Sequence, residues 1–96
     1  MHNEIVAKLK SYLAAIDSER IKSNKVVKTI NLFNYIINVI SWINLDERLK
    51  LRRTIYKKIQ LLKSDQYNYL NDNLKLYFYT TLNKCENLLN LTNIKT

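Results

Sequence analysis

The chain has no glycine and no proline among its 96 residues. Tight β-hairpin turns depend on residues that tolerate a positive φ or that fix φ near about −65°. A β-rich fold would be hard to build without either residue. The sequence therefore predicts an all-α fold, in which long helices are joined by short polar turns.

Cysteine and histidine are almost as scarce, since Cys85 and His2 each occur once. A single cysteine excludes an internal disulfide, and with it a disulfide-stabilised secreted domain. The opening residues, MHNEIVAKLK, have no apolar run behind their basic residues, so we expect no signal peptide. The predicted location is the cytoplasm of the producing cell or of its host.

The residues of most catalytic and metal sites are missing or scattered in the sequence. No set of His, Cys and carboxylate residues has the spacing of metal ligands, and there is no glycine-rich phosphate loop. Cys85 falls in an apolar helical stripe, where a buried inert thiol is the ordinary interpretation. We therefore expect no metal, no cofactor and no enzymatic activity.

Asparagine, lysine, isoleucine and tyrosine, by contrast, make up 43 of the 96 residues. These amino acids have AT-rich codons, and lysine outnumbers arginine twelve to four. Such a composition is typical of phages, plasmids and other mobile elements of hosts with AT-rich genomes. It also weakens any functional argument that rests on the abundance of lysine or asparagine alone.

Apolar periodicity predicts four helices in one domain, residues 1–96, with a short frayed tail at 92–96. Asn44 stands three residues before Glu47, the spacing of a capping box with Asn as the cap, and marks the start of the third helix. Short joints make consecutive helices antiparallel. We expect a compact up-down four-helix bundle, self-contained or completed by dimerisation, with helices at about 3–20, 24–43, 45–63 and 65–91.

The last two helices have recognisable apolar stripes. The core face of the third consists of Leu51, Ile55, Ile59 and Leu62. The stripe of the fourth passes through the polar residues 71–73 without losing phase, which predicts one long helix, kinked at most. Its members are Tyr67, Leu70, Leu74, Tyr77, Thr81, Cys85 and Leu88.

The longest uncharged stretch runs from Thr29 to Leu45. A membrane span needs about 20 predominantly apolar residues, and this stretch is shorter and includes four asparagines. On a helix its apolar residues cover an arc of about two-thirds of the circumference, far more than an ordinary surface helix shows. Either the other helices of the bundle bury this arc, or a second copy or a target protein covers part of it.

Three residues mark the edge of this arc: Tyr35 and Trp42 flank it, and Asn38 lies in the narrow polar stripe beside it. Aromatic side chains at the border of an apolar surface are typical of the core of a protein interface. We therefore predict Tyr35, Asn38 and Trp42 as contacts of a protein partner.

The third predicted helix is strongly basic, because residues 48–63 hold seven basic side chains and no acidic one. A row of cations suits either phosphates or an acidic protein surface. A face that meets only solvent explains it equally well. The predicted basic ridge consists of Arg48, Lys50, Arg52, Arg53 and Lys57.

The sequence LKLRRTIYKKIQ, followed by YNYLNDNLKLYFYTTLNK, resembles the Hha/YmoA group of small helical nucleoid modulators. The matching positions in the later part are Asp72, Asn73, Phe78 and Tyr79, with Leu74 one residue early. The similarity covers about a third of the chain and leaves the first 43 residues without a counterpart. It implies a role near DNA-bound proteins, although the acidic partner-contacting position of that group falls near the uncharged Asn83.

Two functions follow from these features. The first is a small non-enzymatic binding protein of a mobile element that modulates a larger protein by contact, as an inhibitor, antitoxin-like, immunity or adaptor protein. The second is a dimeric basic helical regulator that binds nucleic acid, or associates with the nucleoid, through the helix at 45–63.

Overall fold

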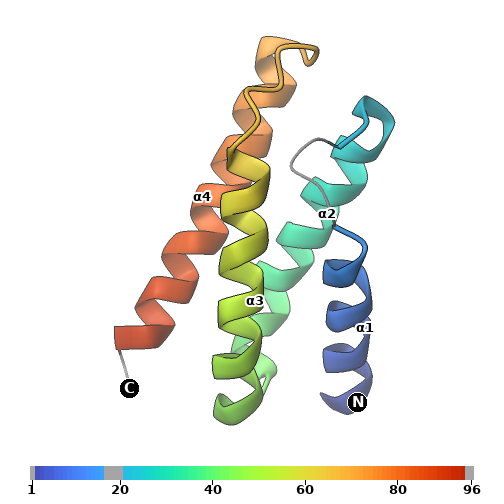
Figure 1. Cartoon of the computed structure of the whole chain (residues 1–96). Coiled ribbons are helices and arrows are strands. Elements are labelled where there is room, and N and C mark those ends of the chain that lie inside the picture. The colour runs from blue at the N-terminus through green and yellow to red at the C-terminus, as the bar shows by residue number, and fades with distance from the viewer. Residues whose placement is uncertain (1, 17–20, 95–96) are drawn as a thin grey trace.

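The computed structural model describes residues 2–16 and 21–94. Consecutive helices alternate in direction and form an antiparallel four-helix bundle (Figure 1), as predicted. The close helix pairs are α1 with α3, α2 with α4 and α3 with α4. The elements of the described chain are α1 His2–Ala14, α2 Ser23–Val39, the 3-10 turn η1 Ile40–Trp42, α3 Leu45–Lys63 and α4 Asp72–Ile94.

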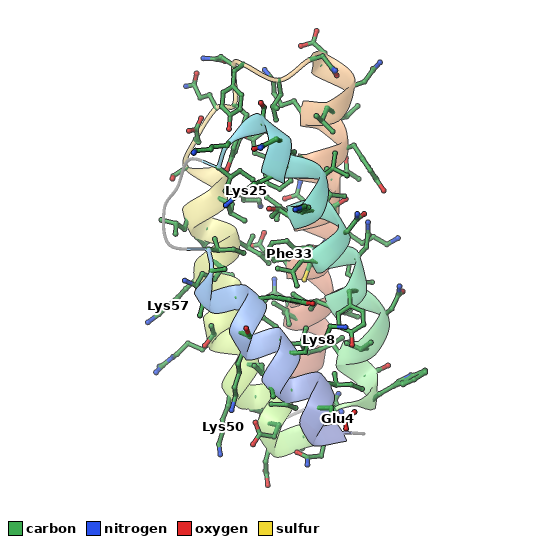
Figure 2. All side chains as sticks on the ribbon, turned by 90° about the vertical axis from the view of Figure 1, so that its right-hand side faces the viewer. Glu4, Lys8, Lys25, Phe33, Lys50 and Lys57 are labelled. Carbon is green, nitrogen blue, oxygen red and sulfur yellow. The ribbon has the colours of Figure 1, made fainter. Side chains whose placement is uncertain are left out.

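The core lies along the inward faces of all four helices. The predicted core face of α3 is buried in full, and α2 contributes a matching row. Figure 2 shows the labelled side chain of Phe33 inside the bundle. Most of the broad apolar arc of α2 is therefore covered by the protein itself, through Val26, Ile30, Phe33, Ile36 and Val39.

The start of α3 confirms the predicted cap. The side-chain Oδ1 of Asn44 accepts a hydrogen bond of 3.0 Å from the backbone N–H of Glu47. Asp46 and Glu47 lie in the first turn and Lys63 in the last, which is the charge order that the helix dipole favours. These local signals explain why α3 has the bounds that the sequence predicts.

The first two helices differ from their predicted ranges. α1 ends at Ala14 instead of near residue 20, because the next residues tighten into 3-10 hydrogen bonds and Ile16 turns into the core. α2 is α-helical only as far as Val39, and η1 replaces the predicted last turn to residue 43. Residues 17–20 lie outside the described residues.

The fourth helix begins at Asp72, so the prediction of one helix from residue 65 is wrong. Tyr67 adopts a positive φ of 55°, so no helix can continue through this residue, although it is not a glycine. Its N–H donates to the Asp65 carboxylate over 2.7 Å, and Asn71 then caps α4 by accepting from the N–H of Leu74 over 2.8 Å. At its other end α4 continues to Ile94, past the predicted end at Leu91.

An aromatic cluster holds this turn in place. The buried ring of Tyr67 packs edge-on against Phe78, with 5.1 Å between centroids, and against Tyr79, with 6.0 Å. Tyr79 also donates its hydroxyl hydrogen to the backbone carbonyl of Asp65. The ring contacts offset the cost of a left-handed tyrosine, which is of the order of 1–3 kcal/mol.

The apolar stripe of α4 is also displaced from the predicted one. Tyr77 is 53% exposed, and Leu74 and Leu88 are only partly buried. Thr81 and Cys85 are buried, as predicted, but the packing turns the buried face of α4 toward Phe78, Leu82 and Leu89. The buried residues of α4 are Phe78, Thr81, Leu82, Cys85 and Leu89.

Candidate functional site

The predicted basic ridge on α3 separates into two kinds of residue. Arg48 donates from Nη2 to the carbonyl of Ile43 over 3.2 Å, and Arg52 donates from Nε to the carbonyl of Leu89 over 3.3 Å. Both arginines are half-buried. Arg48 is therefore hydrogen-bonded to the end of η1, and Arg52 is hydrogen-bonded to α4. Both guanidinium groups point toward the bundle.

Lys50, Arg53 and Lys57 are exposed, as predicted. None of these three has a hydrogen bond or ion pair with another residue of the described chain. Figure 2 shows the labelled Lys50 and Lys57 projecting from α3 at the edge of the molecule. The part of the predicted ridge that is free to bind a ligand is thus this trio, which we call the α3 trio.

The three predicted interface residues lie along α2 and η1 and differ in their exposure. Asn38 is exposed, and the ring of Tyr35 is half-buried on the side of α2 that faces α1. Trp42 instead belongs to η1, at the end of the bundle where α2 leads into α3 (Figure 1). The structure therefore places Tyr35 and Trp42 in two different candidate surfaces.

Trp42 is the centre of the first surface. It is 75% exposed, which is unusual for the largest apolar side chain. Leu45 and Leu49, one turn apart at the start of α3, are 47% and 36% exposed. We call these three residues the apolar corner.

The second surface is a groove between α1 and α2 that the sequence did not predict. These helices follow one another in the chain but are not among the closely packed pairs. The space between them has a volume of about 730 Å³, and Figure 2 shows the labelled Lys8 and Lys25 on these two helices. The residues that line it include Lys8, Tyr12, Lys25, Thr29, Leu32 and Tyr35.

Lysines surround this groove on both sides. Lys22 and Lys28 also line it, so α2 contributes three lysines and α1 contributes Lys8. The ammonium group of Lys8 lies 5.8 Å from the ring centroid of Tyr12 and 5.4 Å from that of Tyr35. We call this site the basic groove.

The floor of the basic groove is apolar. Ala15, Ile16, Ile21 and Leu32 line it between the lysines, together with the rings of the two tyrosines. The hydroxyl group of Tyr69 donates a hydrogen bond to the backbone carbonyl of Ile21. This bond holds the residue that leads into α2. The groove thus combines an apolar base with a cationic rim.

The buried titratable groups have structural explanations. Burial, and after it the neighbouring Glu86 carboxylate, raises the pKa of the Cys85 thiol to about 12. Glu86 itself accepts from Lys63 over 2.7 Å and from Gln60 over 2.6 Å. Burial, and then the charge of Asp65, raises the pKa of the Tyr67 hydroxyl group.

A search for metal ligands within residues 2–16 and 21–94 finds no group of three or more His, Cys, Asp or Glu residues that could hold an ion. Within the same ranges no helix has the length and apolar character needed to cross a membrane.

The basic groove could not be recognised in the sequence, because its lysines are spread over two predicted helices. Each looks like an ordinary exposed residue of a lysine-rich chain. Their grouping depends on the distance between α1 and α2, which no local pattern specifies. The one available signal was the run of three lysines between residues 22 and 28 at the start of a helix.

Comparison of the chain with protein-family models, with curated proteins and with solved structures finds no match. The similarity to the Hha/YmoA group therefore stays a local resemblance, and it assigns no function to this chain.

Proposed function

We propose that this protein is a small non-enzymatic binding protein that modulates a larger protein by occupying part of its surface. The exposure of Trp42 at the apolar corner is the observation that carries the proposal. An inhibitor, an antitoxin-like or immunity protein and an adaptor all work in this way. The abundance of amino acids with AT-rich codons supports an origin in a phage or plasmid. The target would then lie in the cytoplasm of the producing or infected cell.

A tryptophan at this position is poorly explained by folding alone. The bundle buries most of the apolar arc of α2 but leaves the ring of Trp42 in water, where its burial contributes little to folding. Tryptophan is enriched among the residues that dominate binding energies, particularly when apolar neighbours surround it. Leu45 and Leu49, at the start of α3, are the exposed large apolar residues that follow Trp42 most closely in the chain.

The test is affinity capture from a nuclease-treated lysate of the host, with the parent chain and with Trp42→Ala as baits. We expect specific protein bands that survive nuclease and disappear with Trp42→Ala. The matched control is Leu76→Ala, because Leu76 is 68% exposed and lies near the start of α4, at the opposite end of the bundle (Figure 1). Bands that depend equally on both residues would contradict a role of the apolar corner.

The second candidate function, a dimeric regulator that binds nucleic acid, is favoured by one observation. The α3 trio provides three exposed cations, at intervals of three and four residues, that no carboxylate of the described chain neutralises. Such a row fits the spacing of successive phosphates along one helix face. In that case a second copy of the chain, and not a target protein, would cover the apolar corner.

A further inference from the structure

The basic groove is long and open, which restricts the ligands that fit it. It follows α2 from Lys22 to Tyr35, a distance of about 20 Å at 1.5 Å per residue. A compact metabolite would fill only part of this length. An extended occupant, such as a helix of about three to four turns, matches it.

The distribution of polarity in the groove indicates an amphipathic occupant. Apolar side chains such as Ile16, Ile21 and Leu32 form the floor, and lysines stand on both edges. A helix that lies in a groove inserts apolar residues spaced by three and four positions and keeps its polar flanks at the rim. Here those flanks would meet four ammonium groups and so would carry carboxylates.

The start of α2 is a second, independent reason to expect a negatively charged ligand. The first turn of α2 has no acidic residue, and the side chain of Lys22 at the cap position makes no capping hydrogen bond. Lys22 and Lys25 instead place two positive charges beside the positive end of the helix dipole, which repels them, and Lys28 adds a third positive charge about one turn further along α2. An acidic ligand in the groove would relieve this repulsion.

Lys8 adds a positive charge on the opposite wall of the groove. Its ammonium group already lies over the rings of Tyr12 and Tyr35, so it is held at the rim before any ligand arrives. The same contact opposes a single nucleic-acid strand, whose bases would need the free faces of these rings for stacking. Apart from these two tyrosines, the lysines, Thr29 and Asn31, the groove lining is aliphatic.

We propose that the basic groove docks an acidic amphipathic helix of the partner protein. This inference rests on the proposed function, because it assigns to the same partner a second contact, separate from the apolar corner. The groove gives the contact its charge selectivity, and the apolar corner gives it a tryptophan anchor.

The experiment uses a designed probe and the full chain labelled with ¹⁵N. The probe is a capped helical peptide of about fourteen residues, with leucine at every third or fourth position and glutamate along both flanks. We expect its addition to shift backbone amide signals of residues 8–16 and 21–35 in the NMR spectrum, and raised salt to weaken binding. The same peptide with lysine in place of glutamate should cause no such shifts.

Two matched double variants locate the site. Lys25→Glu combined with Lys28→Glu should lower the affinity for the acidic probe by about tenfold or more, because attraction at the rim becomes repulsion. Lys75→Glu combined with Lys84→Glu makes the same change in net charge on α4 and should lower it by no more than about threefold, because salt screens charges that do not line the groove. Equal losses, or amide shifts confined to α3, would overturn the proposal.

Two further results distinguish this inference from nucleic-acid binding in the groove and from the proposed function. A thymidine oligonucleotide of about fifteen bases that shifts the groove signals at lower concentration than the peptide would assign the groove to nucleic acid instead. Trp42→Ala should bind the peptide as the parent does. A parent chain that captures protein through Trp42 but shows no groove shifts would overturn the groove assignment and leave the proposed function standing.

Discussion

Two neighbouring isoleucines of α2 have different surroundings. Ile36 is fully buried, whereas Ile37 lies half-exposed at the edge of the core. Ile36→Asp would place an unpaired carboxylate in the core, so we expect a loss of about 4 kcal/mol or more, enough to unfold much of the population. In Ile37→Asp the carboxylate reaches water, and we expect a loss of about 1–2 kcal/mol.

Circular dichroism at 25 °C and urea titration measure both losses. If the two variants lose equal stability, the orientation of α2 in the bundle is wrong. The sequence alone could not separate these residues, because both fall inside the apolar arc and only the packing of α4 against α2 distinguishes them.

The buried thiol of Cys85 makes stability sensitive to alkali. Its pKa is about 12 in the folded chain, against an ordinary value of 9.0. Between these values the unfolded chain loses the proton while the folded chain keeps it, so stability is intact below about pH 9 and falls as the pH rises. The expected loss from this group is about 1.4 kcal/mol by about pH 10.

Urea titrations at about pH 8 and about pH 10 should show this loss in the parent and not in Cys85→Ala. Tyr67 and Tyr79, whose pKa values are also raised, contribute in the same direction at higher pH and are present in both chains. Identical pH slopes for the parent and the variant would show that Cys85 is not buried as described.

At the scale of elements, the sequence predicted best where the signals are local. α3 has a cap, a charge order and an apolar stripe that agree with one another, and its bounds are as predicted. The start of α4 was missed because the chain turns there without glycine or proline. Tyr67 adopts the left-handed conformation only because its ring is buried against Phe78, a contact that no local pattern reveals.

Among the candidate surfaces, too, the sequence predicts what depends on local signals and misses what depends on packing between elements. The exposed side chains of the α3 trio could be predicted from their place opposite the apolar stripe of the same helix. The inward-turned Arg48 and Arg52 could not, since their acceptors lie outside that helix, at Ile43 and Leu89. The basic groove, which needs the placement of two helices, could not be predicted at all.

A triple variant of the α3 trio tests the second candidate function. Changing Lys50, Arg53 and Lys57 to Glu lowers the net charge from +8 to +2 and should leave the fold nearly intact, because all three side chains are exposed. If α3 binds phosphates, the affinity of the parent for DNA or RNA should fall steeply with salt, by about one counterion per contact, and the variant should lose it.

Fluorescence anisotropy of a labelled duplex at several salt concentrations measures this affinity. Lys75→Glu combined with Lys84→Glu, on α4, shows what a lower net charge does away from α3. Weak binding by the parent, with no further loss in the triple variant, would remove nucleic acid from the functions of this helix. Unchanged capture of protein by the variant would then leave the trio as a solvated face.

At the scale of the whole molecule, the positive charge is distributed unevenly. The basic groove and the α3 trio lie on different sides of α1, whereas the last third of the chain, residues 65–96, is neutral in sum. The apolar corner lies at the end of the bundle where α3 begins. A partner that covers the corner and the groove together would meet α2 along most of its length, since η1 follows directly from it.

The same arrangement predicts the oligomeric state of the free protein. The bundle buries its own core, including most of the apolar arc of α2, so folding does not need a second chain. We expect sedimentation equilibrium at about 10 μM to give a monomer of 11.5 kDa, with a thermal midpoint that does not change with protein concentration.

Trp42 should emit at the long wavelength of a water-exposed indole, because it is 75% exposed. A dimer with blue-shifted emission, converted to a monomer by Trp42→Ala but not by Leu76→Ala, would assign the apolar corner to a second copy of the chain and withdraw it from the target protein.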